Sequence, residues 1–129
     1  MVSEPNLSDI YRDYLDCLNR RDWASLGRFV ADDVIHNGRR IGLSGYRDML
    51  ERDVHEIPDL RFVVELLVTQ PPVVASRLAF DCRPRHRFLG LPIDGRRISF
   101  AENVFYTFRD GKIAQVWSVI DKTAIETQL

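Results

Sequence analysis

The spacing of the hydrophobic residues changes near Pro58, and this change constrains the fold more than any other feature of the 129-residue sequence. Before Pro58, hydrophobic residues recur at intervals of three and four, as in amphipathic helices. After it, the chain consists of segments rich in β-branched and aromatic residues, which are typical of strands. Helices followed by antiparallel strands predict an α+β fold. No linker or repeat divides the chain, so we expect residues 1–129 to form one domain.

The N-terminal half contains signals for three helices. The first is predicted from Ser8 to about Asn19, and a second, shorter one follows Asp22, a residue type that caps helix N-termini. The third begins near Ser44 and ends before Pro58, because proline cannot continue a helix. Between the second and third, the stretch ADDVIHNG predicts a short extended segment that ends at an Asn-Gly turn.

Four strands are predicted in the second half. Their sequences are LRFVVELLV, VVASRLAFDCR, RRISFAENVFYTF and KIAQVWSVID. Asp110-Gly111 separates the last two by the chemistry of a two-residue hairpin turn. The tail KTAIETQL is predicted to form a last helical turn. Such a small chain can enclose a pocket if the sheet bends strongly around the helices.

Composition excludes several classes of partner. The chain has 18 basic and 19 acidic side chains, a balance that gives no reason to expect nucleic acid or an anionic membrane. No stretch resembles a signal peptide or a membrane-spanning segment. Cys17 and Cys82 match no metal or redox spacing, and His36 and His86 fit no known ligand pattern. We therefore expect a cytoplasmic protein without a metal site.

The segment VWSVID places an aspartate, Asp121, at the end of an apolar strand. If Asp110-Gly111 is a two-residue turn with regular pairing, opposed residues share a face of the sheet. That face then contains Phe100, Glu102, Val104, Tyr106, Gln115, Trp117, Val119 and Asp121. Glu102 and Asp121 become diagonal neighbours roughly 7–8 Å apart. Two carboxyls among aromatic residues would have at least one raised pKa, as acid/base catalysis near neutral pH requires.

Two alternatives remain open for this hairpin. A bulge would shift the pairing by one residue, and Asn103 rather than Glu102 would then share a face with Asp121. Trp117, Val119 and Asp121 stay together in both registers, because they are alternate residues of one strand. Asp121 can also be a strand-end residue that caps the following helical turn, and Glu102 can be a surface residue paired with Arg77.

Several stretches, in this order along the chain, resemble SnoaL-like polyketide cyclases of the NTF2-like superfamily. They are LNRRDWASLGRFVADDVIHNG, GLSGYRDML, FLGLPIDGRRISFAENVFYTFRDGKI and VWSVIDKTAIETQL. The resemblance implies a cone-shaped α+β barrel, with about three N-terminal helices packed into a strongly curved, mostly antiparallel sheet around a deep hydrophobic pocket. It also implies a homodimer formed through the outer face of the sheet.

The resemblance also implies roles for individual residues. Asp121 matches the general acid/base of a cofactor-free intramolecular aldol closure, and His36 and Asn37 match a V-x-H-N segment that lines the pocket. A histidine often present on the strand before DGKI is absent here. The first helix resembles that of ketosteroid isomerases, where a tyrosine at the place of Tyr14 hydrogen-bonds the enolate oxygen. Without that context, Tyr14 reads as a core aromatic.

These observations support two functional hypotheses. In the first, a small hydrophobic carbonyl compound enters the pocket, Asp121 removes a C–H proton, and His36, Asn37 or Tyr14 stabilises the enolate oxygen before cyclisation or isomerisation. Glu102, Trp117 and Val119 are then expected to contact the substrate. In the second, the same fold is a non-catalytic ligand-binding or accessory domain, since fold alone does not determine function.

Overall fold

The computed structural model describes residues 6–129, and its helices lie where the sequence pattern predicts them. The Asp22 side chain makes no capping hydrogen bond, however, and the third helix begins at Gly42, so Ser44 lies inside it. They are α1 (Leu7–Asn19), the 3-10 helix η1 (Trp23–Arg28), α2 (Gly42–Glu56) and the short α3 (Lys122–Glu126). The side chain of Asn6 caps α1 by accepting from the backbone N–H groups of Ser8 and Asp9 at 3.0 and 3.4 Å. None of the helices in this part of the chain has the length and apolar character that a bilayer crossing demands.

Eight strands form one large sheet and one small hairpin. They are β1 (Val30–His36), β2 (Arg39–Arg40), β3 (Val63–Gln70), β4 (Val73–Cys82), β5 (Arg87–Phe88), β6 (Leu91–Pro92), β7 (Ile98–Arg109) and β8 (Lys112–Ile120). Six of them make the sheet, in the order β2-β1-β8-β7-β4-β3, and β5 pairs with β6. Only β1 and β8 are parallel neighbours. The predicted α+β architecture with a curved, mostly antiparallel sheet is confirmed, and the sheet is open rather than closed into a barrel.

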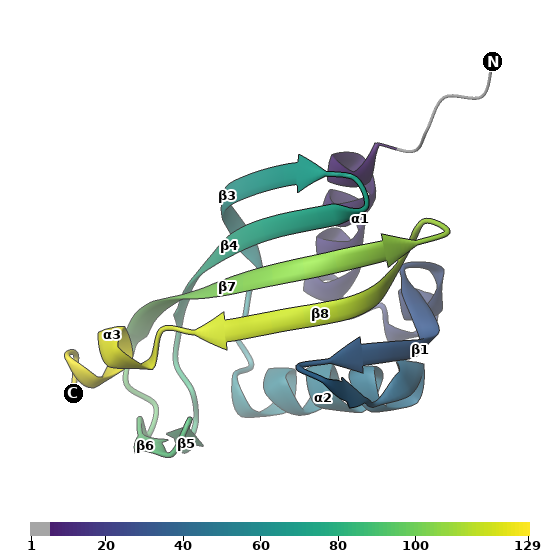
Figure 1. Cartoon of the computed structure of the whole chain (residues 1–129). Helices are drawn as coiled ribbons and strands as arrows, with labels where there is room; N and C mark the ends of the chain where they lie inside the picture. Colours follow the sequence, from purple (N-terminus) through teal and green to yellow (C-terminus); the bar gives the residue numbers. More distant parts are fainter. Residues whose placement is uncertain (1–5) are drawn as a thin grey trace.

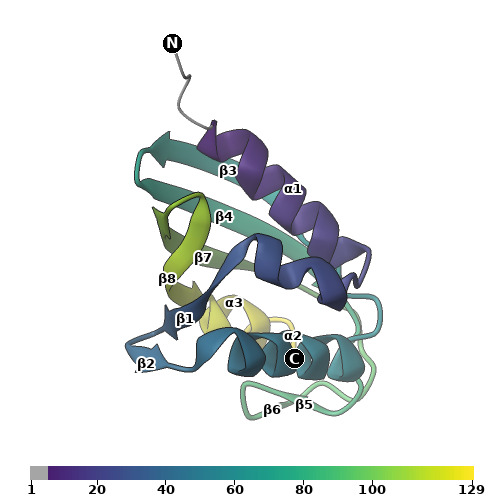
Figure 2. The same cartoon turned by 90° about the vertical axis from the view of Figure 1, so that its right-hand side faces the viewer.

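Helices α1 and α2 lie on the same side of the sheet (Figures 1 and 2). They bury their apolar stripes against its inner surface, which excludes water from one continuous hydrophobic core. Residues of α1 such as Tyr11, Tyr14 and Leu18 are almost completely buried in this core. Neither α1 nor α2 lies on the opposite, outer surface of the sheet (Figures 1 and 2).

The pairing of β7 with β8 determines which side chains face the helices. Arg109 lies opposite Lys112, so the predicted two-residue turn is confirmed. One residue further along, Phe108 pairs with Ile113 but Thr107 pairs with Gln115, which leaves Ala114 as a β-bulge. The bulge moves every later residue of β8 to the other face. The expected inner positions of Trp117, Val119 and Asp121 are therefore wrong. The bulged register that the sequence left open is the observed one, and it puts Asn103 rather than Glu102 on the face of Asp121.

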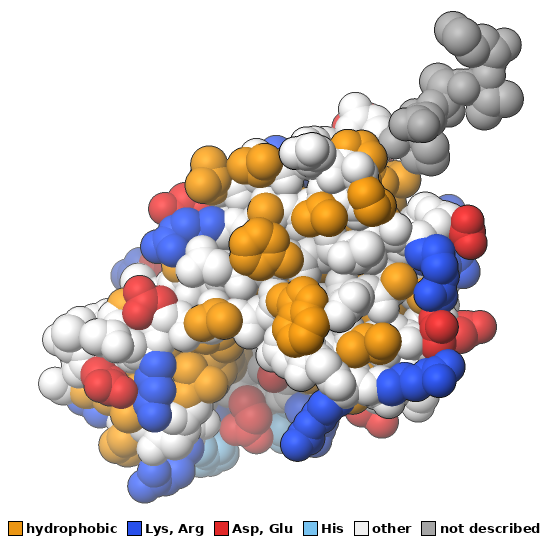
Figure 3. All heavy atoms as spheres, in the orientation of Figure 1, with side chains coloured by type: hydrophobic (Ala, Val, Ile, Leu, Met, Phe, Trp, Pro, Cys, Tyr) orange, Lys and Arg blue, Asp and Glu red, His pale blue; other side chains and the backbone are white. Residues whose placement is uncertain are grey.

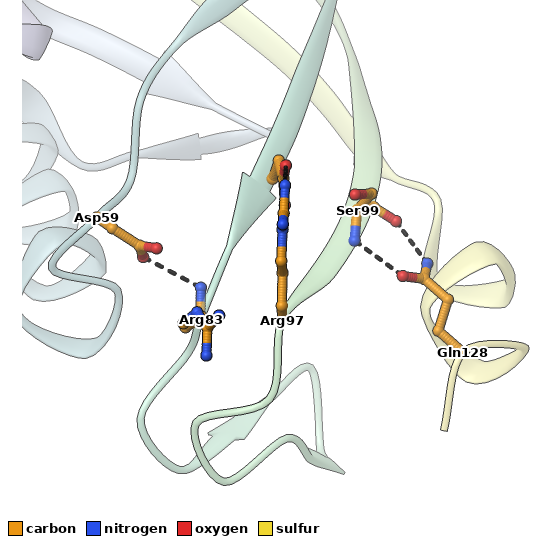
Figure 4. A network of polar contacts seen from close by, with 6 residues as sticks. Asp59, Arg83, Arg97, Ser99 and Gln128 are labelled. Atoms are coloured by element: carbon orange, nitrogen blue, oxygen red, sulfur yellow. Dashed lines mark hydrogen bonds and ion pairs between the residues drawn. The ribbon is translucent and has the colours of Figure 1, made fainter.

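Polar contacts fasten the ends of the long strands at one edge of the molecule (Figure 4). The Gln128 side chain accepts from the Ser99 N–H at 2.9 Å and donates to the Ser99 carbonyl at 2.5 Å. The Arg83 N–H donates to the Asp59 carboxylate at 3.1 Å. These contacts hold the C-terminal residues against β7, and they hold the loop after α2 against the end of β4.

Candidate functional site

A cavity of about 480 Å³ lies between the inner face of the sheet and helices α1 and α2. Apolar side chains supply much of its wall: Leu18, Met49, Leu50, Phe62, Leu78, Phe88, Leu89, Val104, Val116 and Ile120. Its polar lining comes from Tyr14, His36, Asn37, Tyr46, Asp53, Glu102, Tyr106, Ser118 and Lys122. A concave, mainly apolar space with a few polar groups is the usual form of a small-molecule site.

Glu102 projects into this cavity from the middle of the sheet. It lies on β7 between the buried residues Phe100 and Val104, on the inner face that the sequence predicted for all three. The Ser118 hydroxyl donates a hydrogen bond to the Glu102 carboxylate from the neighbouring strand. Burial raises the pKa of Glu102, and the Ser118 hydrogen bond acts in the opposite direction. The result is an oriented carboxyl whose pKa is shifted toward neutral pH.

A second carboxyl, that of Asp53, enters the cavity from α2. The residue is exposed to solvent, and the protein atoms around its carboxyl desolvate it in part. Burial and then the nearby charge of Glu102 raise the pKa of Asp53 to about 6, while Arg52 lowers it. The site therefore holds two acids that influence one another.

Three tyrosines line the cavity, from three elements: Tyr14 of α1, Tyr46 of α2 and Tyr106 of β7. The hydroxyls of Tyr14 and Tyr46 lie 2.7 Å apart in a hydrogen bond that either can donate. Tyr11 donates to Ser76 at 2.8 Å and approaches the Tyr106 hydroxyl at 3.4 Å. Each phenol has one proton, so the Tyr14–Tyr46 bond uses one and leaves the other available to a ligand.

His36 and Asn37 lie at the end of β1, where they line the cavity as expected. Burial lowers the pKa of His36, which favours its neutral ring. The Asn37 amide accepts from the Ser118 N–H at 2.8 Å and donates to the Ser118 carbonyl at 3.3 Å. Asn37 therefore positions Ser118, the residue that orients Glu102.

Three predicted site residues do not line this cavity. Asp121 is exposed at the end of β8, and its carboxylate accepts from the Ala124 N–H at 3.1 Å as the N-cap of α3. Trp117 and Val119 lie on the outer face and are 48% and 68% exposed. The structure therefore agrees with the helix-cap interpretation of Asp121. Among the predicted site residues, it brings Tyr14, His36, Asn37 and Glu102 together.

Sequence reasoning missed Asp53 and Ser118. Ser118 was missed because the bulge at Ala114 reverses the two faces of β8. Asp53 had a signal, since it continues the stripe of α2 that contains Tyr46, Leu50 and Ile57. An acid in an apolar helical stripe indicates either a strained position or a functional one.

Comparison with known proteins identifies the scaffold. The family model described as SnoaL-like polyketide cyclase matches residues 8–129. The crystal structure of a SnoaL-like polyketide cyclase from Agrobacterium tumefaciens has 55% sequence identity and a TM-score of 0.96, over 97% of this chain and 98% of that one. TsrD from Streptomyces laurentii shares the fold at 24% identity and a TM-score of 0.83, over 99% and 97% of the two chains. A search of curated protein sequences finds no match.

Proposed function

The chain belongs to the SnoaL-like polyketide cyclase family, and we propose that it binds a small hydrophobic carbonyl compound and removes one of its C–H protons with Glu102 as general base. The observation that carries this proposal is the Glu102 carboxyl in a mainly apolar cavity, held by Ser118. A base of this kind is effective because its pKa lies nearer the working pH than that of a solvated glutamate.

Proton removal next to a carbonyl places negative charge on the carbonyl oxygen, and that charge needs a hydrogen-bond donor. The unused proton of the Tyr14–Tyr46 pair is one candidate donor. The neutral ring of His36, which lines the same cavity, is another. The enolate carbon formed in this way can attack a second carbonyl group and close a ring, or it can be reprotonated at another carbon to give an isomer. The first outcome is the chemistry that the family name describes.

The proposal can be tested without the natural substrate. We suggest 2-tetralone, a bicyclic ketone with acidic C–H groups beside its carbonyl, in deuterated buffer, with deuterium incorporation followed by proton NMR. The protein is expected to accelerate exchange above the buffer rate, and 2-naphthol, a planar mimic of the enolate, is expected to inhibit it. Glu102→Gln should abolish the acceleration, whereas Glu126→Gln, which neutralises an exposed glutamate on α3, should retain it.

The alternative is a binding or accessory domain without turnover, and the same assay separates the two. A binder would retain 2-naphthol, detected by fluorescence, and would not accelerate exchange. Equal acceleration by Glu102→Gln and by the unmodified protein would show that Glu102 is not the base.

We also propose that a second copy of this chain covers the outer face of the sheet. Large apolar side chains are exposed there: Leu66, Val68, Phe105, Trp117 and Val119. One row runs across four adjacent strands, because Val68 lies opposite Ala75, Ala75 opposite Phe105, and Phe105 opposite Trp117. Hydrophobic groups spread over this face (Figure 3), as is usual for surfaces that bind another protein. A two-fold dimer would bury this patch against its own copy.

A further inference from the structure

Asp53 is an unpaired carboxyl in a position that packing would assign to an apolar residue. Its neighbours on the same stripe of α2, Tyr46, Leu50 and Ile57, are all buried. Within residues 6–129, the Asp53 side chain makes neither an ion pair nor a hydrogen bond. Asp53 is exposed to solvent, and its carboxyl also lines the cavity. A carboxyl that faces a cavity and is not tied to another side chain is free to contact a ligand there.

Asp53 and Glu102 share the cavity from opposite sides, since one lies on a helix and the other on the sheet. Both also line a narrow apolar extension whose wall includes four phenylalanines: Phe62, Phe80, Phe88 and Phe100. A ligand that fills the main cavity and this extension is therefore in reach of both carboxyls.

The environments of the two carboxyls favour different protonation states. Glu102 accepts a hydrogen bond from Ser118, which stabilises its ionised form. Asp53 has no such donor, and the charge of Glu102 opposes its ionisation, so its pKa is raised to about 6. Two neighbouring acids whose environments separate their pKa values in this way commonly divide the roles of base and acid.

Other charged groups near Asp53 do not neutralise it by direct contact. Arg52 lies on the same helix and lowers the pKa of Asp53. This effect is smaller than the increases that burial and the charge of Glu102 cause. His36 of β1 and Lys122 of α3 line the same cavity, and neither forms an ion pair with Asp53. Lys122 is exposed to solvent, which screens its charge and weakens its attraction to the Asp53 carboxylate.

We propose that Asp53 is a second catalytic carboxyl, which donates a proton to the substrate oxygen while Glu102 takes one from carbon. This proposal rests on the proposed function of the cavity. In the first step, the Glu102 carboxylate accepts the C–H proton and the electron pair of that bond becomes the C=C bond of an enol. The π electrons of the adjacent carbonyl move to its oxygen, which receives the proton of the Asp53 carboxylic acid. In a ring closure, the enol carbon then attacks a second carbonyl carbon, the enol O–H proton returns to Asp53, and the new alkoxide takes the proton from Glu102, so no proton is gained or lost.

The pH dependence of deuterium exchange into 2-tetralone tests this division of roles. In the unmodified protein the rate should rise with pH as Glu102 ionises and fall as Asp53 loses its proton, near pH 6. Asp53→Asn keeps the size of the side chain but cannot donate the acid proton. We expect it to lose the falling limb and, at the optimum, on the order of 100-fold in rate. Asp48→Asn, which neutralises an exposed acid on the same helix, should leave the profile unchanged.

A falling limb that persists in Asp53→Asn while Glu102→Gln is inactive would overturn the Asp53 proposal and leave the proposed function intact. Absence of exchange by the unmodified protein would contradict the proposed function instead. In that case, a carboxyl 13C NMR titration of Asp53 tests the interaction of Asp53 with Glu102 independently of exchange. We expect its midpoint to move to lower pH in Glu102→Gln, because a like charge is removed, and an unmoved midpoint would overturn the pairing.

Discussion

The Ser118 hydroxyl donates a hydrogen bond to the Glu102 carboxylate across the β7–β8 pair, inside the cavity. The two residues are not directly opposed, since Ser118 lies opposite Val104 and Glu102 lies opposite Ile120. They meet as diagonal neighbours on the inner face of the sheet. The carboxyl is thus held in one orientation by a strand whose own position is fixed by the Asn37 amide.

Replacement of Ser118 by alanine is predicted to raise the pKa of Glu102 further. The hydroxyl stabilises the ionised carboxylate and so lowers the pKa, and its removal leaves burial unopposed. The rising limb of the exchange rate should therefore move to higher pH. The backbone contacts of Ser118 to Asn37 should persist, because they do not involve the hydroxyl. Ser44→Ala, at an exposed serine, is the control, and a limb that stays in place or moves to lower pH would contradict the prediction.

Tyr14 and Tyr46 should be energetically coupled. Their hydroxyls share one hydrogen bond of 2.7 Å, so Tyr14→Phe and Tyr46→Phe should each lower the free energy of unfolding by about 1 kcal/mol. The double variant should lose less than the sum of the two, because the second substitution removes a bond that is already broken. Urea unfolding of the four proteins measures this cycle, and strictly additive losses would show that the bond contributes nothing.

Asp121 is predicted to support stability and not proton transfer. Asp121→Ala removes the N-cap of α3 and should lower the free energy of unfolding by about 1 kcal/mol. Asp121→Asn should be nearly neutral, since asparagine caps helices as well as aspartate does. Both variants should accelerate exchange into 2-tetralone as the unmodified protein does. Loss of exchange in a folded Asp121→Asn variant would instead restore Asp121 as the acid/base.

A charge within the apolar patch of the outer face should separate the proposed dimer. Val119→Lys places an ammonium group on the most exposed of the large apolar residues of that face, where dimerisation would have to desolvate it. Light scattering should give the mass of two chains for the unmodified protein and of one chain for Val119→Lys. Glu51→Gln changes the net charge by the same amount on α2, which lies on the helical side of the sheet, and should remain dimeric. A monomeric unmodified protein would refute the dimer.

Much of the fold could be predicted because the period of the hydrophobic pattern differs between helices and strands. Residues 8–19 form a helix, and the Asp110-Gly111 turn joins two antiparallel strands, as expected. The sequence left open whether Glu102 or Asn103 faces the pocket, and the structure places Glu102 there.

The face of β8 could not be predicted, because one extra residue in a strand reverses it and the hydrophobic pattern does not reveal that residue. Contacts with distant parts of the chain accompany the bulge at Ala114. The neighbouring Ile113 N–H donates to the Phe29 carbonyl at 2.8 Å, and β1 pairs with the residues that follow. Both faces of β8 carry large apolar groups, such as Val116 inside and Trp117 outside, so either orientation satisfies the sequence. The candidate proton-transfer residue on this hairpin is consequently Glu102 rather than Asp121.

A crystal structure of the protein with 2-naphthol, whose ring carbon C1 corresponds to the acidic carbon of 2-tetralone, tests the role of Glu102 most directly. We expect the ring to lie in the cavity, with C1 about 3–3.5 Å from a Glu102 carboxylate oxygen, as proton transfer requires. Its hydroxyl should point to the Tyr14–Tyr46 pair, to His36 or to Asp53. A ring bound on the outer face beside Asp121, or one inside the cavity that leaves Glu102 out of reach, would contradict it.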